Sequence, residues 1–178
     1  MTKRSSLNAH EAAEVLAGVT PIPLHRDQLN RVAPAINGTN LRGGETHFPS
    51  GRATGQSLLL FLSLTCTGCL DLFAALECPE QFAGSETEVV VILRSLEVDE
   101  KERIRAVLHG TQCLVSPSAW SDYRVSGPPF YVLVDHDQSK IITEGVAWGV
   151  ASISEGITAA RHGDHSHEIK HLDSFPDE

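Results

Sequence analysis

The residues of this chain best suited to chemistry are two cysteines, Cys66 and Cys69, separated by Thr67 and Gly68. They follow a continuous apolar run, residues 57–64, which turn residues bound on both sides and which therefore predicts a strand buried on both faces. Behind the pair, apolar residues recur at helical spacing, which predicts a helix that begins there. The N–H groups and the dipole of a helix N-terminus stabilise a thiolate and lower the pKa of a cysteine placed there.

A thiolate in that position is a nucleophile, and a second thiol one turn further along can resolve the mixed disulfide that the first one forms. The pair therefore predicts thiol–disulfide exchange, with Cys66 as the attacking and Cys69 as the resolving catalytic residue. Two other interpretations stay open at this point. The cysteines are either two small core residues or ligands of a metal ion.

Composition and charge exclude several classes of protein. The 178 residues suffice for one domain, and 14 Lys and Arg against 23 Asp and Glu give a net charge of −9. This balance argues against a nucleic-acid binder, which needs clustered basic residues. No apolar run suits a secretory signal or a membrane span, so we expect a cytoplasmic protein without a membrane segment. No phosphate-binding loop or His-Glu-x-x-His pair is present, and we expect neither a cofactor nor a metal.

Strand and helix patterns alternate along the rest of the chain. They predict a short helix in residues 1–20, a weak hairpin in 34–55, strands at 57–64, 88–93, 112–115, 129–135 and 140–146, and helices after Cys69 and at 99–108, 118–123 and 152–161. This order predicts an α/β fold, with a mixed central sheet and helices on both faces. We expect three segments: an N-terminal helical extension (1–33), the domain itself (34–161) and a His-rich flexible tail (162–178).

Other candidate metal-binding or redox residues lie outside this pair. The tail contains His162, His165, His167 and His171, which form either a solvated terminus or a site for Zn, Ni or Cu. Cys78 and Cys113 are expected to be structural, although a disulfide between them or a third redox thiol stays open.

Two segments resemble the signatures of a known superfamily. Residues 61–69 (FLSLTCTGC) resemble the active-site strand and loop of the thioredoxin superfamily. Residues 127–135 (GPPFYVLVD) resemble its second signature, the cis-proline loop, with Pro129 in the cis-proline position. The long stretch between them, with an extra strand and helix, is similar to the TlpA and MauD branch. The motif around Cys66 resembles the methylamine-utilisation MauD-type proteins in particular, and the likeness covers roughly residues 38–161.

This resemblance implies a thioredoxin-like fold and a thiol–disulfide oxidoreductase. The partner would be a protein or small-molecule thiol or disulfide, and the electron donor is unknown. The backbone beside Pro129 would pair with an extended substrate segment. The substrate-binding residues implied are Thr65, Thr67, Gly68, Pro128, Pro129 and Phe130.

Two positions depart from the superfamily pattern. Thr65 stands where thioredoxins usually carry Trp, and Leu60 stands where they carry a buried acid that helps to deprotonate the resolving thiol. Two alternatives to an oxidoreductase therefore stay open. One is a thioredoxin-fold chaperone that binds copper or zinc, and the other is a non-catalytic interaction module in a maturation or biosynthetic system.

Overall fold

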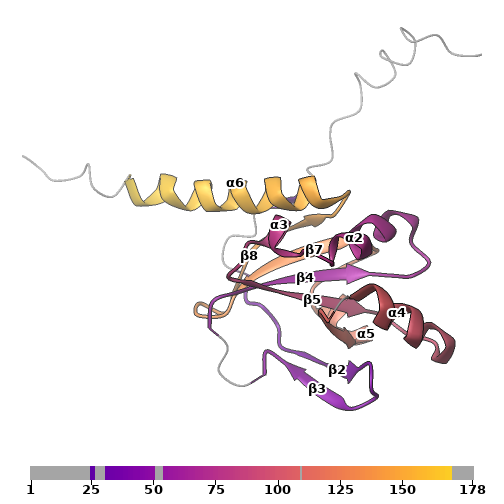
Figure 1. The fold of residues 1–178 in the computed structure, drawn as a ribbon. Coiled ribbons are helices and arrows are strands. Elements are labelled where there is room, and N and C mark those ends of the chain that lie inside the picture. The colour runs from indigo at the N-terminus through magenta and orange to yellow at the C-terminus, as the bar shows by residue number, and fades with distance from the viewer. Residues whose placement is uncertain (1–24, 27–30, 51–53, 109, 170–178) are drawn as a thin grey trace, which may run out of the picture.

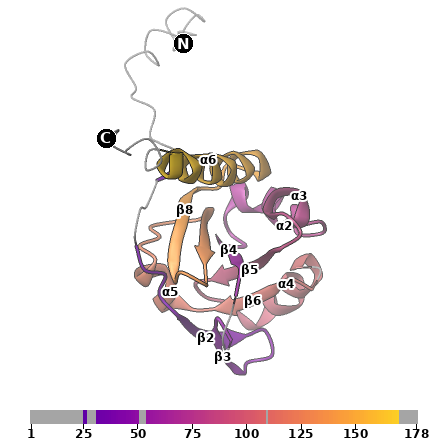
Figure 2. The same cartoon turned by 90° about the vertical axis from the view of Figure 1, so that its left-hand side faces the viewer.

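The computed structural model describes residues 25–26, 31–50, 54–108 and 110–169. These residues build three layers, a central sheet with helices on both of its faces (Figures 1 and 2). This is the mixed α/β architecture that the sequence predicts. The helix expected in residues 1–20 lies outside the described residues.

The sheet has eight strands in the order β1-β8-β7-β4-β5-β6-β2-β3. Strands β4, β5 and β6 run parallel to one another, and all other neighbours are antiparallel. The strands are β1 (His25–Arg26), β2 (Ile36–Asn40), β3 (Glu45–Phe48), β4 (Gln56–Leu62), β5 (Thr87–Leu93), β6 (Gln112–Val115), β7 (Phe130–Asp135) and β8 (Lys140–Val146).

Strand β4 lies in the interior of the sheet, between β5 and β7, and its last five residues are completely buried. Because successive side chains of a strand point to opposite faces, Leu58, Leu60 and Leu62 enter one core, while Leu59 and Phe61 enter the other. The prediction of a strand buried on both faces is confirmed. The last residue of β4, Leu62, lies at the end of the sheet from which the chain continues to Cys66.

Helices cover the two faces unequally. The face of Leu60 packs against α2 (Leu70–Ala75), α3 (Glu80–Ala83), α4 (Lys101–Leu108) and α6 (Val150–Ile169), and the opposite face packs against α5 (Pro117–Asp122). Two 3₁₀ turns, η1 (Thr67–Cys69) and η2 (Val98–Glu100), lead into α2 and α4. Strand β6 and helix α5 form the inserted strand–helix unit expected between the two signatures, whereas α3 has no counterpart in the sequence prediction.

Helix α6 is longer than its sequence pattern predicts. It runs from Val150 to Ile169, so residues 162–169, which we expected in a flexible tail, are helical. The polarity of these residues favours an unstructured tail. However, polar residues without a proline can continue a helix whose first turns are held by buried side chains, here Ile153 and Ile157. His171 lies outside the described residues.

The N-terminal extension joins the sheet rather than standing apart from it. Strand β1 pairs with β8, and Val32 forms a bridge with Lys140. Arg31 pairs with the buried Glu144 of β8, with 2.8 Å between Nη2 and Oε2, and donates from Nη2 to the Tyr123 carbonyl at 3.1 Å. The described residues 25–26 and 32 thus pair with the sheet, which the sequence does not predict because so short a paired segment leaves no periodic pattern. The helical extension expected for residues 1–33 otherwise stays a prediction.

The Arg31 side chain joins its own segment to β8 through Glu144 and to the end of α5 through the Tyr123 carbonyl. Removal of the charge on Glu144 tests that role. Glu144→Gln leaves a largely buried guanidinium without its charge partner, so we expect the free energy of unfolding in urea to fall by about 3 kcal/mol. The control Glu102→Gln breaks the exposed Glu102–Arg105 pair, which should change it by less than about 1 kcal/mol. Equal effects of the two substitutions would contradict the prediction.

A second contact fixes α6 on the sheet. Tyr131 of β7 is fully buried, and its hydroxyl lies where a Cβ on Gly156 of α6 would stand. Although Ala favours helix over Gly, Gly156→Ala should lower the free energy of unfolding by about 1–3 kcal/mol through overpacking. Adding Tyr131→Phe removes the hydroxyl, so a double-mutant cycle in urea should show favourable coupling. Additive effects of the two substitutions on the free energy of unfolding would show that the Tyr131 hydroxyl and the side chain at position 156 do not interact.

Candidate active site

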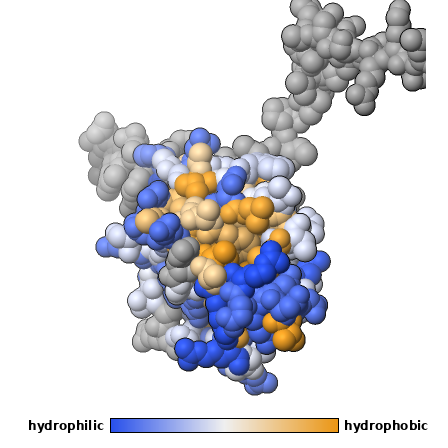
Figure 3. All heavy atoms as spheres, turned by 45° about the vertical axis from the view of Figure 1, so that its right-hand side comes forward, coloured by the Kyte–Doolittle hydropathy of each residue, from blue (hydrophilic) through white to orange (hydrophobic). Residues whose placement is uncertain are grey.

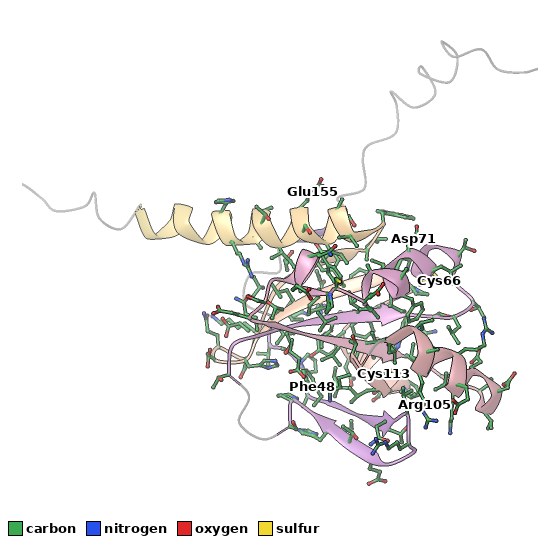
Figure 4. All side chains as sticks on the ribbon, viewed as in Figure 1. Phe48, Cys66, Asp71, Arg105, Cys113 and Glu155 are labelled. Atoms are coloured by element: carbon green, nitrogen blue, oxygen red, sulfur yellow. A yellow bond between two sulfur atoms is a disulfide. The ribbon has the colours of Figure 1, made fainter. Side chains whose placement is uncertain are left out.

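A short turn carries the chain from β4 to the cysteine pair. The Cys66 N–H donates to the Ser63 carbonyl at 3.3 Å, which closes the turn. The Ser63 and Thr65 hydroxyl oxygens are 2.9 Å apart, and the Thr65 N–H donates to Ser63 Oγ at 3.3 Å. Cys66 thus lies at the end of the sheet toward which β4 points, beside α2 (Figure 4).

Cys66 and Cys69 form a disulfide, with their Cα atoms 5.3 Å apart. Cys66 has an extended backbone and caps η1, and the Cys69 N–H donates to the Cys66 carbonyl at 3.0 Å. The two residues differ in exposure, because Cys66 is half-buried whereas Cys69 is completely buried among Leu60, Leu72 and their neighbours. An external thiol or disulfide can therefore approach Cys66 but not Cys69.

The helix predicted at the pair begins as a 3₁₀ turn. η1 spans Thr67–Cys69 and α2 continues from it as Leu70–Ala75, with Asp71 in its first turn. Leu72 and Phe73 are buried and anchor α2 on the sheet. Cys66 therefore stands directly at the start of a helical segment, as the spacing predicts.

The second signature lies against the first. The Pro128–Pro129 peptide bond is cis, and a Cβ on Gly68 would lie 3.7 Å from Pro129 Cδ and Cγ. Pro128 is exposed and Pro129 is buried. The loop that contains Pro128 and Pro129 (the proline loop) thus packs beside the loop of residues 65–69 (the cysteine loop). The two signatures therefore form one surface.

The other residues implied by the resemblance are arranged around this surface, with one exception. Thr65, Thr67 and Gly68 are exposed along the cysteine loop. Phe130 is half-buried and packs against the core on the α5 side, whereas Cys69 belongs to the core on the α2 side. The Phe130 side chain is therefore not brought together with the sulfur atoms.

A third loop, which the sequence prediction did not include in the site, completes the surface. Pro129 accepts a hydrogen bond at 3.0 Å from the N–H of Ala147, just after β8. The next residue, Trp148, is 70% exposed, although the size of an aromatic side chain favours burial. A tryptophan in the turn between a strand and a helix, followed by Gly149, is the only sequence signal for this position.

A cleft of about 240 Å³ opens beside Thr65, between the carboxyl ends of β4 and β5. It is lined by Ser63, Leu64, Thr65, Leu93, Ser95, Leu96, Glu97 and Glu100. Glu97 and Glu100 begin η2 as a reciprocal capping box, in which the Glu97 N–H donates to Glu100 Oε2 at 3.0 Å. The cleft adjoins the cysteine loop and carries two carboxylates.

The remaining cysteines are separate free thiols. Cys78 is half-buried and Cys113 is buried, so the disulfide between them that the sequence left open does not form. Burial raises the pKa of the Cys113 thiol to about 12. Cys113 is therefore a protonated core residue at neutral pH.

Among the residues that the structure describes, no three His, Cys, Asp or Glu side chains are grouped closely enough to hold a metal ion. No described helix is both long and apolar enough to cross a lipid bilayer.

No protein-family model and no curated protein matches the chain. Solved structures do match. The thioredoxin domain of a thiol-disulfide oxidoreductase from Bacteroides vulgatus superposes with a TM-score of 0.57 at 17% identity, over 70% of this chain and 91% of that one. This chain has a thioredoxin-like fold.

Two further structures agree with this assignment of the fold. A thiol:disulfide interchange protein from a Bacteroides species matches with a TM-score of 0.55 at 20% identity, over 76% of this chain and 94% of that one. A secreted disulfide oxidoreductase from Mycobacterium tuberculosis matches with a TM-score of 0.53 at 16% identity, over 69% and 94%. The fold class predicted from the sequence is confirmed.

The contrast between the free thiols can be measured by alkylation. At pH 8 the Cys113 thiol is protonated and buried, so in the reduced native protein we expect iodoacetamide to modify it at least about tenfold more slowly than Cys78. Mass spectrometry of tryptic peptides against time measures both rates. In urea the two rates should converge, and equal rates in the native protein would contradict the prediction.

Proposed function

We propose that this protein is a thiol–disulfide oxidoreductase that works through Cys66 and Cys69. The observation that carries the proposal is the unequal burial of the pair, since Cys66 is half-buried while Cys69 has no exposed surface. A dithiol of this kind reacts with a partner through one sulfur and resolves the product through the other. The solved thiol-disulfide oxidoreductases of the same fold support the proposal.

The reaction runs in two exchanges. In the reduced protein, the Cys66 thiolate attacks one sulfur of the partner's disulfide, and the other sulfur leaves as a thiolate and takes up a proton. The Cys69 thiolate then attacks Cys66 Sγ, which releases the second partner thiol and closes the Cys66–Cys69 disulfide. Two electrons pass from the protein to the partner, and the reverse sequence oxidises a partner dithiol.

The surroundings of the pair fit these roles. Thr65, Thr67 and Gly68 are exposed beside Cys66, and Pro128 is exposed on the neighbouring loop. A partner segment therefore meets Cys66 between the two signatures, where the backbone next to Pro129 offers hydrogen-bonding groups to an extended chain. Thr65, Thr67, Gly68, Pro128 and Pro129 are the proposed substrate-binding residues, and Phe130 contributes through its backbone at the start of β7.

Within the fold, we propose a TlpA- or MauD-like type. The inserted β6 and α5 between the two signatures support it. Leu60 is fully buried between Val91 and Tyr131, so the resolving thiol has no carboxyl at that position. We also propose that the protein works in the cytoplasm, which the free thiols of Cys78 and Cys113 favour, since a reducing compartment keeps thiols unpaired.

The decisive experiment combines a redox titration with cysteine variants. In glutathione buffers of defined potential, alkylation and mass spectrometry should show one reversible two-electron transition confined to Cys66 and Cys69. Cys66→Ser should abolish disulfide exchange, and Cys69→Ser should accumulate a mixed disulfide on Cys66. Cys78→Ser is the matched control and should behave like the native protein.

Other outcomes of this experiment would indicate a different class of protein. Unchanged exchange in both Cys66→Ser and Cys69→Ser would overturn the proposal. Absence of a disulfide together with stoichiometric zinc or copper retention would indicate a metal chaperone. Normal partner binding after both cysteines are replaced would indicate a non-catalytic interaction module.

A further inference from the structure

We propose that the surface around Cys66 selects a polypeptide segment with an apolar residue on one side of its cysteine and a basic residue on the other. The inference rests on the proposed function and names the class of partner that this site takes. It is carried by two features on opposite sides of the cysteine loop. One consists of two exposed apolar side chains, Leu70 directly after Cys69 and Trp148 after β8, on the β7 side of β4. The other is the acidic cleft beside Thr65, at the ends of β4 and β5.

The apolar feature consists of two exposed side chains next to the two loops of the site. Four large hydrophobic side chains are exposed among the described residues, namely Val32, Leu70, Val98 and Trp148. Leu70 directly follows Cys69, and Trp148 directly follows the residue that is hydrogen-bonded to Pro129. Figure 3 shows, for one face of the molecule, that residues of high hydropathy lie in the middle and hydrophilic residues below them. Large exposed apolar side chains next to a reactive residue offer contact area to a partner segment.

Trp148 is held in place before any partner arrives. Ala147 is fully buried and donates to the Pro129 carbonyl, so the residue before Trp148 is fixed on the proline loop. On the other side, the Gly149 carbonyl accepts from Ser152 Oγ at 2.9 Å at the start of α6. Since both ends of this turn are anchored, the indole offers contact area with little loss of conformational entropy on binding. It supplies an aromatic group to a site in which Thr65 stands where thioredoxins usually carry Trp.

The cleft on the other side of the cysteine loop sets the charge of the partner. It contains Glu97 and Glu100 and no basic residue, and the capping box holds both carboxylates at fixed positions. Two arginines that are close to the cleft residues in the sequence have other contacts. Arg94 lies over the Trp120 ring at 4.6 Å, and Arg105 donates to Glu102 and to the Leu41 carbonyl.

Such a cleft favours an ammonium or guanidinium group and disfavours the carboxylates of glutathione. The net charge of −9 acts in the same direction over longer distances.

The two features together favour a polypeptide over a small thiol. A small disulfide that reaches Cys66 contacts one side of the cysteine loop only. An extended segment advances about 3.3 Å per residue, so a few residues on each side of its cysteine extend over both features. The two apolar side chains and the cleft then bind the two flanks of the same segment, and Cys66 faces the sulfur between them.

The test uses three peptides of equal length, each with one cysteine in a mixed disulfide with the neutral thiol 2-mercaptoethanol. The first carries Leu before and Lys after the cysteine, the second Leu and Glu, and the third Gly and Ser. Each reaction converts the peptide disulfide and the reduced protein into peptide thiol, 2-mercaptoethanol and the Cys66–Cys69 disulfide. Rates are followed by acid quench and alkylation, and equilibration with oxidised dithiothreitol measures redox activity without a docking segment.

We expect the Leu–Lys peptide to react at least about tenfold faster than the Gly–Ser peptide. Trp148→Ala should remove most of that advantage, while the distant exposed control Val32→Ala retains it. Glu97→Gln, which keeps a hydrogen-bond acceptor for the cap, should reduce the preference for Lys over Glu. Glu102→Gln makes the same charge change outside the cleft and should not.

The outcomes separate the two proposals. Normal equilibration with dithiothreitol together with equal rates for the three peptides would overturn the docking proposal and leave the redox function standing. Failure to equilibrate would overturn the redox function. In that case, binding of the peptides to the Cys66→Ser/Cys69→Ser protein, measured by Trp148 fluorescence in a Trp120→Phe background, decides the docking surface separately. Equal affinities for the three peptides would then reject it.

Discussion

The burial of β4 on both faces is the constraint on which the rest of the structure depends. Its five apolar residues, Leu58 to Leu62, fill two separate cores at once, so the strand can neither shift in register nor move to an edge without exposing one of them. The end of β4 is therefore fixed relative to the flanking β5 and β7. The cysteine loop begins three residues beyond that end, and β7 begins directly after Pro129, so the sheet itself aligns the two loops.

The features that can be predicted from the sequence are those that depend only on residues close together in the chain. The buried strand, the cysteine pair, the strands β5 to β8 and the helix at residues 99–108 follow from unbroken apolar runs and helical spacing, which need no knowledge of partners. The two loops of the site are also local, because each is a short motif at the end of a strand. Their contact through Gly68 and Pro129 follows once the strands are known to be neighbours.

The features that could not be predicted are decided by contacts between distant residues. The pairing of β1 with β8 is accompanied by the ion pair between Arg31 and Glu144, and neither of these two residues differs in the sequence from a surface charge. Trp148 is exposed directly after the residue that is hydrogen-bonded to Pro129, whereas the hydrophobicity of its side chain alone favours burial. Helix α6 continues past Arg161 because its beginning is anchored, which a local measure of polarity does not detect.

The short outer strands have a consequence for the behaviour of the whole chain. A sheet edge with unpaired N–H and C=O groups is a template for pairing with another molecule, and long, flat, apolar edges invite aggregation. Here the described part of β1 has two residues and β3 has four, and the apolar interior strands lie between them. Strand β8, which carries the fully buried Thr143 and nearly fully buried Glu144, is covered by β1 and by the bridge at Val32. The described N-terminal residues thus place the short β1, rather than the longer β8, at this edge of the sheet, which leaves fewer described backbone groups there for pairing with another molecule.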